Sequence, residues 1–159
     1  MNGGAGGPTT TGATTTDAVA EYTRRIHDMY DAWNDGRMED AYAMIDEHVV
    51  DHNADDAEAG LAGVRLALDG VRRGFPDLRY TVEHVAFDGV DVTAARLRCV
   101  GTHTGDFFGF APTGRGADWR ETRWVRWRDG KVVEHWATTD AMTMMRQLGL
   151  LDTAGRDTW

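Results

Sequence analysis

Cysteine is almost absent from this sequence, and so are long apolar runs. Cys99 is the only cysteine among 159 residues, which excludes an internal disulfide and a zinc site built from several cysteines. No segment approaches the roughly 18 consecutive apolar residues that a membrane-spanning helix needs. The residues after Met1 lack the basic and apolar regions of a secretion signal. These features predict a cytoplasmic protein.

Positive charge is scarce relative to negative charge. The chain has 17 basic and 26 acidic residues, for a formal net charge of -9 at pH 7. Such a protein repels polyphosphates and anionic headgroups, so we expect neither a nucleic-acid partner nor a membrane partner. A hydrophobic small molecule is the ligand that this composition favours.

The chain does contain enough apolar sequence for one domain. Hydrophobic residues make up 42% of it, an ordinary fraction for a globular domain of this length. Residues 1–16 are almost entirely Gly, Thr and Ala, so we expect a disordered tail that has little apolar surface to bury. The sequence predicts a single domain over 17–151 and a second tail over 152–159.

Helical periodicity dominates the first half of this domain. Apolar residues recur at three- and four-residue steps over 17–34, and a shorter pattern follows over 38–45. Another helix is predicted over 61–75, ending before Pro76 because the residue before a proline disfavours the helical conformation. A β-prone segment lies at 48–52.

The second half alternates apolar and polar residues with the period of strands. Strands are predicted over 78–87, 91–104, 118–128 and 131–137, and a short helix over 142–148. Asp-Gly turns join two pairs of these strands, and such tight turns connect antiparallel neighbours. The predicted fold class is therefore α+β, a curved antiparallel sheet with helices on one face.

Strand alternation assigns two histidines to faces of the sheet. His103 shares a face with the apolar Leu97, which we interpret as the interior. In the last strand, His135 falls on the same side as Val133 and opposite Val132. His135 is a second candidate for an inward-facing histidine.

A charged pair lies on the strand between them. Glu121 and Arg123 share one face, and alternation leaves open which face is interior. If inward, they would join the histidines as an acid, a base and a charge stabiliser in one pocket. The structural alternative is a buried ion pair beside hydrogen-bonded core histidines.

Metal and nucleotide binding have weaker support. Asp51, His52, His103 and His135 are the residues from which a metal site would have to be assembled, but no short ligand spacing joins them. The glycine-rich start precedes no strand, so it is not a phosphate-binding loop. We expect no metal and no cofactor.

Several short motifs occur in a fixed order over roughly residues 20–150: Val50 to Asn53, Phe75 to Leu78, Gly101 to Gly105, Gly109 to Arg115, Asp129 to Trp136, Asp140, and Arg146 to Gly149. In their order and spacing, these motifs resemble the SnoaL-like polyketide cyclases and their ester-cyclase relatives. The resemblance implies the α+β cone of nuclear-transport-factor-like domains, with a pocket between the curved sheet and the helices.

The resemblance also implies a reaction and shows where this sequence departs from it. The polyketide cyclases of the family close a ring by intramolecular aldol addition, with an acidic side chain near the end of the last strand as acid and base. Ala137 occupies that position here, His135 matches a family histidine, and Arg123 replaces a pocket histidine. The catalytic candidates are His103, Glu121, His135 and Asp140, and the substrate-binding candidates are His52, Arg123, Trp127 and Phe110.

These observations predict a cofactor-independent enzyme of the isomerase or lyase type that cyclises a hydrophobic polyketide-like intermediate in antibiotic biosynthesis. Two alternatives stay open: an epoxide-opening or ether-forming cyclase or hydrolase, and a cone domain that binds a small molecule without chemistry. A homodimer is expected because Trp124, Trp127 and Trp136 supply more bulk than one pocket needs.

Overall fold

A computed structural model describes residues 15–53 and 60–151 of the chain. The elements, in order, are α1 (Thr15–Asn34), α2 (Met38–Ala43), β1 (Ile45–Asp51), α3 (Gly60–Gly74), β2 (Arg79–Phe87), β3 (Val92–Thr102), β4 (Gly116–Arg128), β5 (Lys131–Thr139) and α4 (Ala141–Leu148). The tail predicted over 152–159 lies outside the described residues. So does the other tail, except that its last two residues already belong to α1.

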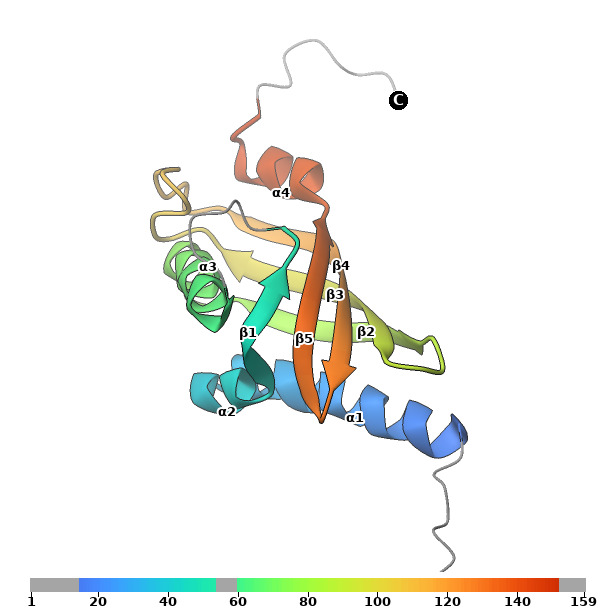
Figure 1. The fold of residues 1–159 in the computed structure, drawn as a ribbon. Helices are drawn as coiled ribbons and strands as arrows, with labels where there is room; N and C mark the ends of the chain where they lie inside the picture. Colours follow the sequence, from blue (N-terminus) through green and yellow to red (C-terminus); the bar gives the residue numbers. More distant parts are fainter. Residues whose placement is uncertain (1–14, 54–59, 152–159) are drawn as a thin grey trace, which may run out of the picture.

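The sheet has five strands in the order β1-β5-β4-β3-β2 (Figure 1). Strands β2 to β5 are antiparallel neighbours, as the Asp-Gly turns predict. β1 differs, because it lies parallel to β5 at the edge of the sheet. The sequence prediction of a wholly antiparallel sheet therefore holds for four strands, and the fifth joins through a long crossover rather than a hairpin.

The helices cover one face of this curved sheet. α1 packs against β2 and β3, α3 packs against β1, and α4 packs against β4 (Figure 1). Large apolar side chains fill the space between the layers, including Trp33, Phe75, Leu97, Trp119 and Trp127. The α+β cone is therefore confirmed, with its interior between α1, α3 and the inner face of the sheet.

A β-bulge near the start of β5 changes which side chains face inward. Trp127 on β4 lies opposite Val132, and the register then shifts by one residue, so that Val133 is extra. Val132 and His135 consequently both face the interior. The prediction that these two residues lie on opposite faces is wrong, because simple alternation does not survive an inserted residue.

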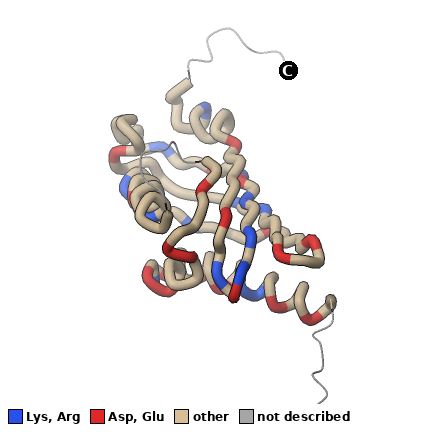
Figure 2. The backbone as a smooth tube through the Cα atoms, in the orientation of Figure 1, with Lys and Arg blue, Asp and Glu red and all other residues tan. Residues whose placement is uncertain are grey.

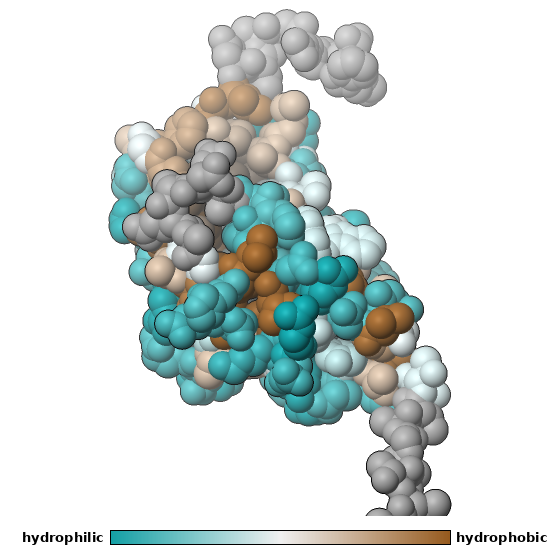
Figure 3. Space-filling model, in the orientation of Figure 1, coloured by the Kyte–Doolittle hydropathy of each residue, from teal (hydrophilic) through white to brown (hydrophobic). Residues whose placement is uncertain are grey.

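The outer surface is mostly hydrophilic. Acidic and basic residues are interspersed along the strands and helices (Figure 2). A small apolar area over β1 and β5 is surrounded by hydrophilic residues (Figure 3). None of the described helices is both long enough and apolar enough to span a bilayer.

Candidate functional site

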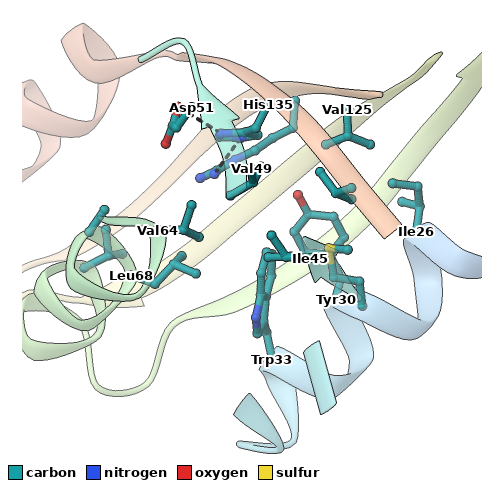
Figure 4. Close-up of a pocket in the computed structure, with 15 residues that line it drawn as sticks. Ile26, Tyr30, Trp33, Ile45, Val49, Asp51, Val64, Leu68, Val125 and His135 are labelled. Carbon is teal, nitrogen blue, oxygen red and sulfur yellow. Dashed lines mark hydrogen bonds and ion pairs between the residues drawn. The ribbon is translucent and has the colours of Figure 1, made fainter. Parts of the chain in front are cut away.

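The interior of the cone contains a cavity of about 100 Å³ between α1, α3, β1, β4 and β5 (Figure 4). Apolar side chains of α1 and α3 line most of it, and the valines of β1, β4 and β5 complete the walls. Three charged or titratable groups lie at one end: Asp51, Arg123 and His135. A mainly apolar cavity with a few convergent polar groups is the usual form of a small-molecule site.

Asp51 and His135 form a close side-chain contact at this polar end. They are register partners in the parallel β1–β5 pairing, so their side chains emerge side by side from adjacent strands. Asp51 Oδ1 lies 3.2 Å from His135 Nδ1. The side chains remain 18% and 16% accessible, which leaves both reachable from the cavity.

The chain after β1 fixes the Asp51 carboxylate. The backbone N–H of Asn53 donates to Asp51 Oδ1 at 2.9 Å. The Asn53 side chain continues the strand pairing, because it donates to the carbonyl of Ala137 at 2.7 Å and accepts from the Ala137 N–H. Burial raises the pKa of Asp51, but its bonds with His135 and Asn53 outweigh burial and hold the pKa below its usual value. Asp51 is therefore ionised at neutral pH.

An ionised Asp51 determines how His135 presents itself to a ligand. The Asp51 carboxylate lies beside Nδ1, so the neutral tautomer that suits this contact carries its proton on Nδ1 and leaves Nε2 as the proton acceptor. Nε2 lies 3.4 Å from Arg123 Nη1. The imidazole of His135, a potential base, and the guanidinium cation of Arg123 therefore lie next to each other in the cavity wall.

Arg123 reaches the cavity with its guanidinium held from behind. Its Nε and Nη2 both donate to Glu121 Oε2, at 2.9 and 2.6 Å. The other oxygen of Glu121 accepts from Trp119 Nε1 at 2.9 Å. These bonds leave N–H groups of Nη1 and Nη2 on the cavity side, where they can donate to a ligand oxygen.

Glu121 itself is buried behind this guanidinium. It is 7% exposed and does not line the cavity. Burial raises the pKa of Glu121, but the charge of Arg123 and the bonds from Trp119, Arg123 and Cys99 lower it below its usual value. Strand alternation left open which face of the sheet these residues occupy. In the structure Glu121 and Arg123 both face inward as an ion pair, and Arg123 is the member that lines the cavity.

The other end of the cavity is aromatic. Tyr30 and Trp33 of α1 lie there with their rings edge to face, 5.0 Å between centroids. Burial raises the pKa of Tyr30, so its hydroxyl stays protonated. The cavity therefore has a charged end at β1 and β5 and an aromatic end at α1 (Figure 4).

His103 lies outside this cavity, although it is fully buried as predicted. Its ring stacks on Phe75 at 5.3 Å, and Nδ1 lies 3.2 Å from Thr113 Oγ1. It thus belongs to the part of the core that holds the loop after β3.

The remaining candidates are also apart from the cavity lining. Asp140 caps α4 by accepting from the Thr143 N–H at 3.0 Å. His52 bonds Glu134 at 3.0 Å and stacks on Trp136, and Phe110 is exposed on a loop. Trp127 is buried and donates to Thr93 Oγ1 at 2.9 Å.

The structure therefore brings together two predicted site residues, His135 and Arg123, with Glu121 behind them. Sequence reasoning placed Asp51 only in the weak metal alternative and missed its pairing with His135. Within the described residues, no group of three His, Cys, Asp or Glu side chains is arranged to hold a metal ion. The sequence signal that pointed to Asp51 was the motif from Val50 to Asn53. Alternation along a strand does not show which other strand this motif pairs with.

The chain matches a known protein family. The family profile of the SnoaL-like polyketide cyclases matches residues 23–148. No curated protein sequence matches the chain significantly.

Solved structures share the fold over nearly their whole length. IdmH of Streptomyces antibioticus, a proposed polyketide cyclase, is 33% identical, with a TM-score of 0.70, over 80% of this chain and 97% of its own. AclR of Streptomyces galilaeus, a proposed hydroxylase, is 30% identical, with a TM-score of 0.74, over 84% and 98%. TsrD of Streptomyces laurentii, at 24% identity and a TM-score of 0.75 over 83% and 97%, shows likeness of fold alone.

Proposed function

Because this chain belongs to the SnoaL-like polyketide cyclase family, we propose that it closes a ring in a hydrophobic polyketide-like intermediate by general acid–base catalysis, without a cofactor. One observation carries this proposal: Asp51, His135 and Arg123 are in contact with one another in sequence, Asp51 with His135 and His135 with Arg123, at one end of an otherwise apolar cavity. Asp51 takes the orienting role in a chain whose Ala137 replaces the family's acidic side chain.

The proposed reaction begins with proton transfer. His135 Nε2 accepts a proton from the carbon next to a substrate carbonyl, while Arg123 donates hydrogen bonds to that carbonyl oxygen and stabilises the enolate. The enolate carbon then attacks a second carbonyl of the same molecule. The new alkoxide takes the proton back from His135, so the net reaction is an isomerisation with every proton accounted for.

Asp51 acts through His135 in this scheme. Its ionised carboxylate keeps the Nδ1–H tautomer in place and stabilises the imidazolium that forms during proton transfer. We therefore assign Asp51 as a positioning residue. By the same argument Glu121 is a positioning residue, because its carboxylate holds the guanidinium of Arg123 in place.

The first half of this reaction is testable with a simple ketone. We expect the protein to accelerate deuterium exchange at the carbon next to the carbonyl of 1-tetralone in D2O, followed by proton NMR. His135→Ala should lower the exchange rate by about 100-fold or more, since general acid–base assistance is typically worth about 10²- to 10⁴-fold. Asp51→Asn should lower kcat with little change in KM.

The control is His48→Ala, which removes an 88% accessible histidine from the same strand as Asp51 and should leave exchange unchanged. Exchange is also expected to survive chelation. If His135→Ala matches the parent rate, His135 is not the base. If the parent binds 1-tetralone but does not accelerate exchange, a binding domain without chemistry replaces the cyclase.

We also propose that the protein works as a homodimer in the cytoplasm, in natural-product biosynthesis. The single, buried, unpaired Cys99 fits a reducing compartment. Trp124, 49% exposed, lies opposite Trp136 on a sheet face that the described helices leave open. An exposed aromatic area of this kind fits an interface between two copies.

A further inference from the structure

The α1 wall of the cavity carries a tyrosine hydroxyl that has no hydrogen-bond partner among the described residues. Tyr30 is 3% exposed, and its side chain lines the cavity. Its contacts with the protein are ring contacts, and its hydroxyl retains accessible surface, unlike the fully shielded indole nitrogen of Trp33. A buried tyrosine hydroxyl usually has a partner, because phenylalanine would fill the same space without an unpaired polar group. This hydroxyl is therefore available to a molecule in the cavity.

The hydroxyl points toward the charged end of the cavity. Figure 4 shows the Tyr30 ring extending from α1 into the cavity, with its oxygen on the side of the strands that carry Asp51 and His135. Burial raises the pKa of Tyr30, and the nearby charge of Arg123 lowers it by a smaller amount. The phenol therefore keeps its proton at neutral pH and is a hydrogen-bond donor beside the groups of the charged end.

Packing fixes the direction of this donor before a ligand binds. The Tyr30 ring packs edge to face on Trp33, with 5.0 Å between centroids, and lies 5.4 Å from the ring of Tyr80. The end of α1 is fastened beside these rings, because Asn34 bonds the backbone of Tyr80 in both directions, at 2.7 and 2.8 Å. A donor held in this way needs little reorganisation when negative charge develops on a ligand oxygen.

We infer that Tyr30 is a further catalytic residue, whose hydroxyl donates a hydrogen bond to the oxygen of the second carbonyl during ring closure. This inference rests on the proposed function, in which Arg123 already serves the first carbonyl oxygen. As the enolate carbon bonds to the second carbonyl carbon, an electron pair of that C=O bond moves to its oxygen. Tyr30 stabilises the resulting alkoxide and keeps its own proton, and His135 returns the proton that it removed from the substrate.

Two reactions separate the two steps. Deuterium exchange at 1-tetralone needs only enolate formation, whereas the closure of 2-(3-oxobutyl)cyclohexanone to its bicyclic ketol also needs the second carbonyl. We expect the parent protein to accelerate both reactions, each followed by proton NMR. Tyr30→Phe should lower kcat for ring closure by about 100-fold, as is typical when one donor to a developing oxyanion is lost, and should leave the exchange rate unchanged.

Tyr80→Phe is the matched control. It removes the hydroxyl of the neighbouring buried ring, which does not line the cavity, and should leave both reactions unchanged. Unchanged exchange in Tyr30→Phe also shows that this variant is folded and that its base is intact.

The outcomes separate this inference from the proposed function. If Tyr30→Phe closes the ring as fast as the parent, or loses both reactions to the same extent, the role of Tyr30 is overturned and enolate formation at His135 stands. A parent that exchanges deuterium without closing the ring overturns it too, because a donor to the second carbonyl then assists no reaction. If the parent accelerates neither reaction, the proposed function fails together with the inference.

Discussion

At the scale of single residues, the buried ion pair of Glu121 and Arg123 connects stability with function. Both side chains are largely buried, since Arg123 is 17% and Glu121 7% accessible, so water cannot fully replace either partner. Removing one member of such a pair leaves the other charge uncompensated, which is more damaging than losing an exposed pair. The pair that aims Arg123 at the cavity is therefore also a structural requirement.

Glu121→Gln tests this requirement. We expect it to lower the free energy of unfolding at pH 7 by about 3 kcal/mol in urea denaturation, because Arg123 loses its counter-charge. Glu39→Gln is the matched control, since Glu39 is 77% accessible where it pairs with Arg65, and its loss should change stability little. Equal stability in both variants would contradict the structural role of the buried pair.

The stability of the parent and of Glu121→Gln should depend differently on pH. The folded-state pKa of Glu121 lies below the ordinary value of 4.5, so its stabilising effect is present above pH 4.5 and is lost as pH falls through the folded-state pKa. The parent should therefore lose more stability than Glu121→Gln between about pH 5 and pH 3. Parallel curves over this interval would show that Glu121 does not titrate as described.

Single residues also show where prediction from sequence stops. Alternation correctly placed His103 in the interior and grouped Glu121 with Arg123, because both statements depend only on neighbours along one strand. The pairing of Asp51 with His135 depends on two strands separated by most of the domain. The sequence pattern within either strand does not determine which residue of the other strand lies opposite.

At the scale of elements, local patterns predicted the four helices and five strands of the described residues, with bounds that differ by a few residues. The predictions that depended on contacts between elements were less complete. β1 joined β5 in parallel, and the bulge at Val133 redirected His135 and Val132. Hydrophobic periodicity indicates which side of a helix or strand is buried. A bulge or an edge pairing depends instead on the neighbouring strand.

The loop between β3 and β4 is fastened to the end of α3 at a glycine. The N–H groups of Thr104 and Gly105 both donate to the carbonyl of Gly74, at 3.1 and 3.2 Å. A Cβ on Gly105 would overlap the carbonyl oxygen of Arg73, which is backbone and has little freedom to move. The close approach of loop and helix therefore requires glycine here.

Gly105→Ala should consequently destabilise the protein by roughly 2 kcal/mol, within the range of overpacking effects. Gly116→Ala is the control at the other end of the loop, where the nearest atom to a new Cβ is 4.0 Å away. Its effect should stay within about 0.5 kcal/mol. Thermal unfolding of both variants makes the comparison, and similar losses would contradict the proposed fastening.

At the scale of the whole molecule, the sheet separates two surfaces with different roles. The cavity lies on its inner face and is lined by residues of the helices and strands of a single copy. Its outer face carries an aromatic patch, defined as His52, Trp124 and Trp136, in which His52 stacks on Trp136 at 4.5 Å. Within the described residues, no helix covers this patch, so a second copy can reach it without disturbing the cavity.

We therefore expect a homodimer whose interface includes the aromatic patch. Sedimentation equilibrium at micromolar concentration should give about twice the chain mass of 17.6 kDa. Trp124→Glu should shift the protein to the single-chain mass, because it places a charge where apolar area is buried between copies. Val90→Glu introduces the same charge at a 77% exposed turn and should leave the dimer intact. A single-chain mass for the parent would remove the dimer, whereas a dimer unaffected by Trp124→Glu would move the interface to another face.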